Sequence, residues 1–174
     1  MKKLIDGCIK GSQKARKELF RLYNRKLLGI CLRYASDKAE AEDMMLEGFM
    51  QIFSKIDTYS HSGSFEGWMN KVMVYTAIDL YRKNKKELFH DNIDDHLEIG
   101  SDDFNALNQL TAREIIELIQ TLPRGYQMVF NLFAIEGYSH KEIAERLEIT
   151  ESTSKSQVRK ARIWLMKKLK NNYE

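Results

Sequence analysis

Apolar residues recur three and four positions apart over most of the chain, which is the period of an amphipathic α-helix. The first such stretch begins after Ser12, a residue type that caps helix N-termini. The second begins at Asp37, with Glu40 three residues later in a capping-box-like order. The third begins at Phe65, after a segment from Asp57 to Ser64 whose Ser, His and Gly content indicates a loop. These stretches predict a helical N-terminal domain.

The helical period is lost between residues 86 and 108, where acidic residues dominate and at most a short helix around 94–99 is expected. A domain boundary is therefore expected in this segment. The sequence predicts an all-α protein of two small helical domains, residues 1–86 and 109–174, joined by a flexible acidic linker, residues 87–108.

Beyond the linker, capping-box patterns at Thr111 and at Ser139 each predict the start of a helix. Pro123, the single proline of the chain, restarts the helical pattern, and Gly137 is well placed to end a helix in a left-handed conformation. The break at Glu148–Thr150 is followed by a long basic helix. This order is typical of a helix-turn-helix, although Glu148 stands where such a tight turn prefers Gly, which leaves open a turn of another construction.

The last helix is predicted to have an apolar and a basic side, because a rotation of about 100° per residue sorts its positions. One stripe faces the core and contains Ser154, Val158, Ala161 and Leu165. The opposite side and its flanks carry no acidic residue; they contain Ser152, Lys155, Ser156, Arg159, Lys160, Arg162 and Lys167. Short hydroxyl residues with Arg and Lys suit base edges and phosphates in a DNA major groove, and a solvated basic helix is the alternative.

Charge is distributed unevenly along the chain, whose formal net charge is +3. Residues 1–86 hold 17 basic and 10 acidic residues, residues 87–108 hold 7 acidic and no basic residues, and residues 109–174 hold 11 basic and 8 acidic residues. Two basic blocks suit a polyanion such as nucleic acid, and the acidic segment either keeps them apart or occupies them. A solvated surface explains the charge equally well.

Several other classes of protein lack support in the sequence. No apolar run is long enough to span a membrane and the start is too charged for a signal peptide, so a cytoplasmic protein is expected. Cys8 and Cys31 lie far apart without ligand spacing, which favours reduced thiols. No cofactor, catalytic group or metal is expected, because the candidate ligands of a helical metalloenzyme crowd one linker: His90, Asp91, Asp94, Asp95, His96, Asp102 and Asp103.

Three segments, in this order, resemble the extracytoplasmic-function (ECF) sigma factors of the sigma-70 family. Ala41–Phe53 is similar to the segment that grips the clamp helices of the RNA polymerase beta-prime subunit. Ser64–Lys86 is similar to the segment that melts promoters and recognises the minus-ten element. Leu122–Arg162 is similar to the helix-turn-helix that recognises the minus-thirty-five element. The resemblance implies sigma domain 2, a linker and sigma domain 4.

The resemblance also implies roles for individual residues. The implied polymerase contacts are Glu42, Asp43, Glu47, Met50 and Gln51. The implied DNA contacts of domain 2 are His61, Ser64, Trp68, Lys71, Tyr75, Asp79, Arg82 and Lys83. Those of domain 4 are Ser152, Thr153, Lys155, Ser156, Arg159, Lys160 and Arg162. The chain departs from the family at Leu46, where Gln is frequent, at Tyr75, where Asn is frequent, and at Ser154, where an apolar residue is usual.

The residues of the middle segment agree with a melting role, because aromatic faces and cations together hold unstacked bases. Trp68, Tyr75 and Tyr81 alternate with Lys and Arg residues there. Core packing is the alternative for Phe65, Trp68 and Val72, and simple exposure is the alternative for His61.

The implied function is that of a sigma factor, without catalysis of its own, that binds core RNA polymerase through the beta-prime clamp helices and the beta flap and directs initiation at promoter DNA. An anti-sigma factor is a further expected partner. The alternative is a stand-alone helix-turn-helix regulator, which explains only the C-terminal third and leaves the segment from Trp68 to Lys86 without a role.

Overall fold

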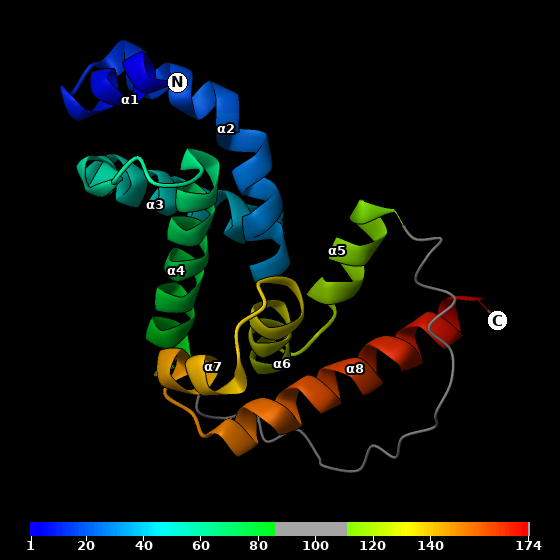
Figure 1. Cartoon of the computed structure of the whole chain (residues 1–174). Helices are drawn as coiled ribbons and strands as arrows, with labels where there is room; N and C mark the ends of the chain where they lie inside the picture. Colours follow the sequence, from blue (N-terminus) through cyan, green and yellow to red (C-terminus); the bar gives the residue numbers. More distant parts are fainter. Residues whose placement is uncertain (86–110, 174) are drawn as a thin grey trace. The chain divides into compact units, whose positions relative to one another are not determined.

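The computed structural model describes residues 1–85 and 111–173 (Figure 1). Every regular element within these residues is helical, which confirms the prediction of an all-α protein. The chain divides into two compact units, Met1–Leu80 and Tyr81–Glu174. The acidic linker and the short helix expected around 94–99 lie outside the described residues.

The N-terminal unit is built from α1 (Lys2–Ile9), α2 (Gln13–Tyr34), α3 (Lys38–Lys55), the short 3-10 helix η1 (Ile56–Thr58) and α4 (Phe65–Lys85), whose last turn passes the end of the unit. Helix α1 was not predicted. It packs against α2 and η1 and buries Ile5 and Cys8, which are only 2% and 1% exposed. An eight-residue helix with two buried positions and no capping side chain leaves too short a pattern to be recognised from sequence.

The predicted N-caps of α2 and α3 are confirmed. The Ser12 hydroxyl accepts a hydrogen bond from the Ala15 amide at 3.3 Å, and the Asp37 carboxylate accepts one from the Glu40 amide at 2.9 Å. The expected capping box is modified, because the Glu40 carboxylate accepts from the Ser36 amide and hydroxyl at 2.6 and 2.7 Å rather than from the Asp37 amide. The ordinary capping box and this modified one both give partners to backbone N–H groups that the start of a helix leaves unpaired.

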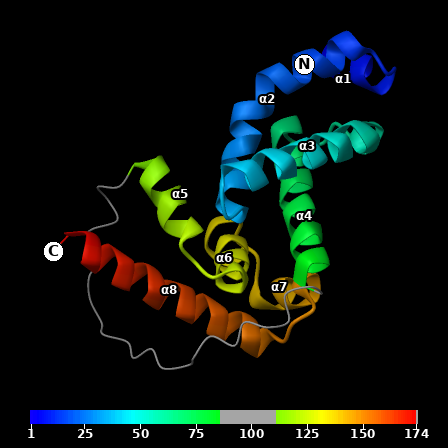
Figure 2. The same ribbon diagram turned by 180° about the vertical axis from the view of Figure 1, so that it is seen from behind.

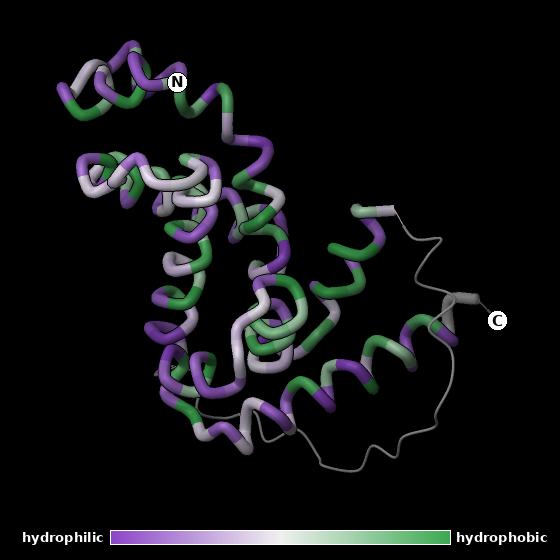
Figure 3. The backbone as a smooth tube through the Cα atoms, viewed as in Figure 1, coloured by the Kyte–Doolittle hydropathy of each residue, from purple (hydrophilic) through white to green (hydrophobic). Residues whose placement is uncertain are grey.

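The core of the N-terminal unit lies between α2, α3 and α4 (Figure 1), along each of which apolar residues recur (Figure 3). The apolar residues buried there are Leu19, Leu27 and Tyr34 of α2, Ala41, Met44, Phe49 and Ile52 of α3, and Phe65, Met69, Met73, Val74, Ala77 and Ile78 of α4. The Cys31 Sγ atom lies 4.0 Å from the Met73 Sδ atom inside this core. Burial of this many apolar side chains is the main stabilising term for a unit of this size.

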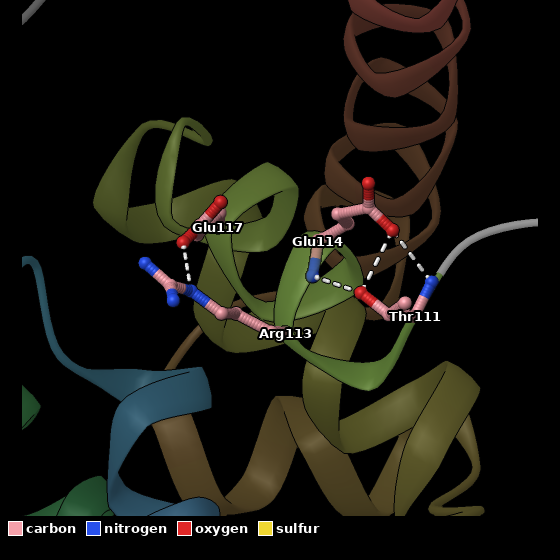
Figure 4. Close-up of polar contacts among 4 residues, drawn as sticks. All are labelled: Thr111, Arg113, Glu114 and Glu117. Carbon is pink, nitrogen blue, oxygen red and sulfur yellow. Dashed lines mark hydrogen bonds and ion pairs between the residues drawn. The ribbon is translucent and has the colours of Figure 1, made fainter.

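The C-terminal unit contains α5 (Ala112–Gln120), α6 (Arg124–Phe130), the π-helix η3 (Asn131–Ile135), α7 (His140–Leu147) and α8 (Glu151–Tyr173). Helix α8 packs against α6 and α7 and, less extensively, α5 (Figure 2). Both predicted capping boxes are confirmed. Figure 4 shows the first: the Glu114 carboxylate accepts from the Thr111 amide and hydroxyl, both at 2.7 Å, and the Thr111 hydroxyl accepts from the Glu114 amide at 3.3 Å. An Arg113–Glu117 ion pair of 2.7 Å lies on the same helix.

The π-helix η3 continues α6 with a wider turn that the sequence pattern did not predict. The Asn131 side-chain amide donates to the Gln127 carbonyl at 2.9 Å, and both residues are buried. Gly137 then adopts a φ of 76°, as predicted, and the Tyr138 amide donates to the Leu132 carbonyl at 2.9 Å. A buried polar residue that bonds the backbone of the preceding turn gives the local widening a physical cause.

The turn between α7 and α8 has the usual left-handed construction. Glu148 adopts φ 54° and ψ 51°, and the Ile149 amide donates to the Ala144 carbonyl at 3.1 Å. The turn of another construction that Glu148 left open is therefore not present. Glu148 adopts this backbone conformation, which costs about 1 kcal/mol for a residue with a Cβ atom, because the packing of two helices fixes the turn.

Candidate nucleic-acid interface

The predicted core stripe of α8 is confirmed. Ser154 and Ala161 are fully buried, Val158 is 4% exposed and Leu165 is 9% exposed. Leu122 joins Ala161 and Leu165 in one apolar cluster. This packing fixes which side of α8 faces solvent.

The solvent-facing side of α8 carries the predicted hydroxyl and basic residues. Exposed positions are Ser152, Lys155, Ser156, Arg159, Arg162 and Lys167, and half-buried positions are Thr153 and Lys160. Glu151, the first residue of the helix, lies 4.0 Å from the Lys155 ammonium group. An exposed pair at this distance contributes little, so the face remains predominantly positive.

The Thr153 hydroxyl is occupied at the start of α8. It lies 2.8 Å from the Thr150 hydroxyl, which also accepts from the Thr153 amide at 3.0 Å. Thr150 is therefore a capping residue for α8, one that the sequence pattern did not indicate. The side chain of Thr153, which is a predicted DNA contact, is therefore also part of this cap.

The buried hydroxyl of Ser154 has a partner in His140, the first residue of α7. The Oγ atom of Ser154 lies 2.9 Å from His140 Nδ1. The imidazole stacks on the Phe133 ring with centroids 4.4 Å apart and an interplanar angle of 13°. Burial lowers the pKa of His140, as do the positive charges of Lys155 and Arg162, while Glu151 acts in the opposite direction.

In the N-terminal unit, α4 presents a polar line opposite its core face. Lys71, Tyr75 and Asp79 are exposed and follow one another at four-residue spacing on the same side of the helix. Further along α4, Lys83 is exposed and Arg82 is half-buried. These residues combine three cations and one aromatic ring with the carboxylate of Asp79, and cations with aromatic faces are the groups that hold single-stranded nucleic acid.

An aromatic cluster lies at the start of α4. The Tyr59 ring centroid is 5.1 Å from that of Phe65 and 5.8 Å from that of Trp68, and the last two rings stack 5.6 Å apart at 15°. Phe65 is buried, which fits the core-packing alternative, whereas Trp68 and Val72 are half-buried. The sequence analysis missed Tyr59, because a lone aromatic residue within a polar loop has no periodic partner.

The loop that precedes α4 is held by its own contacts. The Tyr59 hydroxyl donates to the Gly63 carbonyl at 2.8 Å, and the Ser64 hydroxyl accepts from the Gly67 amide at 3.3 Å. His61 is exposed, has a φ of 57°, and its ring centroid lies 4.9 Å from that of Tyr59. Ser64 is thus the cap of α4. His61 is exposed to solvent and itself adopts a left-handed backbone conformation.

Helix α3 carries the five predicted polymerase contacts. Glu42, Asp43 and Met50 are exposed, while Glu47 and Gln51 are half-buried and joined by a 3.1 Å hydrogen bond from the Gln51 amide to the Glu47 carboxylate. Two large apolar side chains, those of Leu46 and Met50, are 50% and 59% exposed on this helix. The exposed side of α3 therefore combines two apolar side chains with carboxylates.

In residues 1–85 and 111–173, no three His, Cys, Asp or Glu side chains are grouped as metal ligands, and the seven candidates between His90 and Asp103 lie outside these residues. None of the described helices combines the length and the apolar character needed to cross a bilayer.

Comparisons with known proteins agree with both halves of the chain. Residues 19–87 match the family model described as Sigma-70 region 2, and residues 112–165 match that described as Sigma-70, region 4. The ECF RNA polymerase sigma factor SigM of Bacillus subtilis is 31% identical over 150 residues, which cover 83% of this chain and 89% of SigM. The chain belongs to the ECF RNA polymerase sigma factors.

Other relatives extend the match over the length of this sigma factor. The ECF RNA polymerase sigma factor SigW of Bacillus subtilis is 28% identical over 182 residues, which cover 98% of this chain and 97% of SigW. The solved structure of the sigma factor RpoE in complex with the anti-sigma factor NepR from Bartonella quintana has a TM-score of 0.52 at 19% identity and covers 88% of this chain and 96% of that one. At this identity, the structural likeness shows the fold.

The family models divide the described helices in a simple way. The region 2 match spans most of α2 together with α3 and α4, and α1 precedes it. The region 4 match runs from the start of α5 into α8 and includes the helix-turn-helix. The predicted sigma-factor identity and its role in transcription initiation are therefore confirmed, whereas the roles of individual residues stay predictions.

Proposed function

We propose that this sigma factor binds core RNA polymerase and directs it to promoters that it recognises with two separate DNA-binding domains. Residues 1–86 act as domain 2 on the minus-ten element, residues 109–174 act as domain 4 on the minus-thirty-five element, and residues 87–108 connect them. The observation that carries the proposal is the solvent face of α8, whose hydroxyl and basic residues lie opposite a tightly packed core stripe.

The chemistry of α8 supports recognition of a DNA major groove. Ser152 and Ser156, on the first turns, are short enough for the helix to approach base edges closely. Arg159 is exposed and can donate two hydrogen bonds to guanine, and Lys155 and Lys160 can contact phosphates. The capped N-terminus of α8 adds a positive partial charge near the phosphate backbone of the DNA.

The minus-ten role rests on α4 and the loop before it. Lys71, Tyr75 and Asp79 form the exposed polar line, and Trp68 borders it within the aromatic cluster. Opening a duplex requires partners for unstacked bases, and aromatic faces contribute about 1–3 kcal/mol per stacked base. His61 and Ser64 are the residues of the preceding loop that we assign to capture of a flipped base, while Arg82 and Lys83 extend the basic surface.

The polymerase contact is assigned to the exposed side of α3, with Met50 as its apolar centre and Glu42, Asp43, Glu47 and Gln51 around it. Domain 2 docks there on the beta-prime clamp helices and domain 4 binds the beta flap. An anti-sigma factor is the expected inhibitor, in keeping with the RpoE–NepR complex. The protein acts in the cytoplasm beside the polymerase, which performs all nucleotide chemistry.

The test is reconstitution with core RNA polymerase freed of other sigma factors. The chain is expected to co-elute with the core enzyme and to give transcripts with defined start sites on a genomic fragment library. A matched pair of variants separates the two roles: Met50→Asp should abolish co-elution, and Arg159→Ala should reduce initiation without affecting co-elution. Absence of core binding, together with tight binding of the isolated chain to specific duplex DNA, would instead support a stand-alone helix-turn-helix regulator.

A further inference from the structure

His140 connects α8, the proposed recognition helix, to the two elements that precede it. It is the first residue of α7, its ring stacks on Phe133 of η3, and its Nδ1 atom lies 2.9 Å from the Ser154 hydroxyl of α8. The ring is half-buried and Ser154 is fully buried. The hydrogen bond therefore lies at the base of the recognition surface.

Ser154 needs this partner. A buried hydroxyl without a hydrogen bond costs about 1–3 kcal/mol, and the other members of the α8 core stripe, Val158, Ala161 and Leu165, are apolar. A polar residue in that stripe is compatible with stable packing because the imidazole of α7 faces it. Hydrogen bonds are directional, so this pair restricts the placement of α8 more than an apolar contact does.

Phe133 links the same imidazole to a second point on α8. The Arg162 guanidinium lies 5.8 Å from the Phe133 ring centroid, within the range of a cation–π contact. Ser154 and Arg162 are eight residues apart, which corresponds to about 12 Å along a helix axis. Helix α8 is thus contacted at two points, Ser154 and Arg162. One lies before and one after the exposed residues Ser156 and Arg159 in the sequence.

We propose that His140 is a positioning residue that, through its hydrogen bond to Ser154, sets the placement of α8 in the major groove and thereby the promoter preference at the minus-thirty-five element. This inference rests on the proposed function. It assigns His140 a role distinct from contact with DNA, because the atom involved faces the interior of the unit.

Four variants of the full chain test the proposal. His140→Phe keeps an aromatic ring against Phe133 and removes Nδ1. Ser154→Ala removes the hydroxyl. The double variant removes both and leaves no unpaired buried group. His140→Asn keeps a polar atom near the position of Nδ1 and removes the ring.

Two measurements are made on each variant. Initiation by the reconstituted holoenzyme is measured on promoters with every single-base change in the minus-thirty-five element. Hydrogen exchange of the peptides spanning 139–162 reports the local stability of the helix-turn-helix.

We expect His140→Phe to accelerate exchange, and the double variant to restore exchange to within about twofold of wild type because the polar mismatch is gone. The double variant should nevertheless discriminate differently among the promoters, with preference ratios changed about 5- to 10-fold at one or more positions, the scale of a single mismatched base pair. His140→Asn should keep the wild-type order of preference.

Wild-type preference in both His140→Phe and the double variant would overturn the inference and leave the pair a packing role only. Equal shifts in His140→Asn and His140→Phe would overturn it as well, because the hydrogen bond would then not be the cause. Failure of the wild-type chain to initiate at any promoter would overturn the proposed function, an outcome distinct from both.

Discussion

Gly48 of α3 lies directly against the side chain of Met73 on α4. A Cβ atom added to Gly48 would be 2.8 Å from Met73 Cε and closer still to Sδ. Both residues are buried, and Met73 also contacts Cys31 of α2. The missing side chain at position 48 therefore leaves the space that the end of the Met73 side chain occupies.

Gly48→Ala is expected to destabilise the N-terminal unit by about 1–3 kcal/mol, because an overpacked core must shift side chains or backbone. Gly29→Ala is the matched control: Gly29 lies within α2, and an added Cβ meets no atom within 4 Å. Its replacement should stabilise by about 0.5–1 kcal/mol through helix propensity alone. Urea unfolding monitored by circular dichroism measures both, and equal effects of the two changes would contradict the packing argument.

Glu148→Gly is expected to stabilise the C-terminal unit by about 1 kcal/mol, since Glu148 adopts a left-handed conformation with φ 54° that Gly adopts without steric cost. Glu145→Gly, one turn earlier on an exposed position of α7, should destabilise by about as much. Hydrogen exchange of α7 and α8 peptides distinguishes the two. A loss of protection in Glu148→Gly would mean that the turn owes its stability to the Glu side chain.

The capping box of α7 predicts a pH dependence. Hydrogen bonds from the Ser139 hydroxyl and amide lower the pKa of Glu142 below its ordinary value of 4.5. A carboxyl whose pKa is lowered on folding stabilises the folded state above its unfolded pKa, and this contribution is lost as the pH falls through the folded value. Carbon-detected NMR titration should therefore give Glu142 a midpoint below 4.5, and Ser139→Ala should move it upward. An unchanged midpoint in Ser139→Ala would assign the shift to another group.

Both cysteines are expected to resist thiol reagents in the folded chain. Burial raises the pKa of Cys31 to about 12 and also raises that of Cys8. Because the thiolate is the reactive form, neither residue should react with a disulfide reagent at pH 8 until denaturant is added, when both should react. The same shift predicts that stability falls between about pH 9 and 12, where the unfolded thiol ionises and the folded one does not.

Arg159→Ala should lower initiation about tenfold or more and relax preference at one base pair, as expected for loss of a bidentate contact to guanine. Lys167→Ala is the control, since Lys167 is exposed on the same helix two turns later and beyond the segment that matches region 4. It should change initiation little and without base preference. Holoenzyme transcription at several salt concentrations separates base contact from phosphate contact.

Helical periodicity and caps were sufficient to predict most of the fold. Ser12, Asp37, Thr111 and Ser139 each cap the helix expected from the sequence, because a cap is a local interaction between neighbouring residues. Helix α1 was missed because its stability depends on contacts with α2 and η1 that a short segment does not reveal. The π-helix η3 was missed because its wider turn involves the buried polar residue Asn131 and its bond to the Gln127 carbonyl, which an apolar pattern does not indicate.

The candidate site was predicted less completely. The exposed face of α8 follows from helix geometry, so its residues could be identified from the sequence. The reason for a buried Ser154 could not, since its partner His140 lies 14 residues away on another helix. Likewise, Tyr59 and Phe133 act through ring contacts whose partners are set by tertiary packing. The roles assigned on α3 and α4 depend on partners that the chain alone does not contain.

Helix α4 combines a buried apolar side with the exposed line of Lys71, Tyr75 and Asp79, and this arrangement has a consequence for changes in length. Successive residues of this line are about 6 Å apart along the axis, since each residue adds about 1.5 Å. A single inserted residue between Lys71 and Tyr75 would rotate everything after it by about 100° and turn buried positions such as Ile78 toward solvent. Point substitutions on the exposed line leave the core intact, whereas insertions and deletions do not, so sequence variation in α4 should be confined to replacement at constant length.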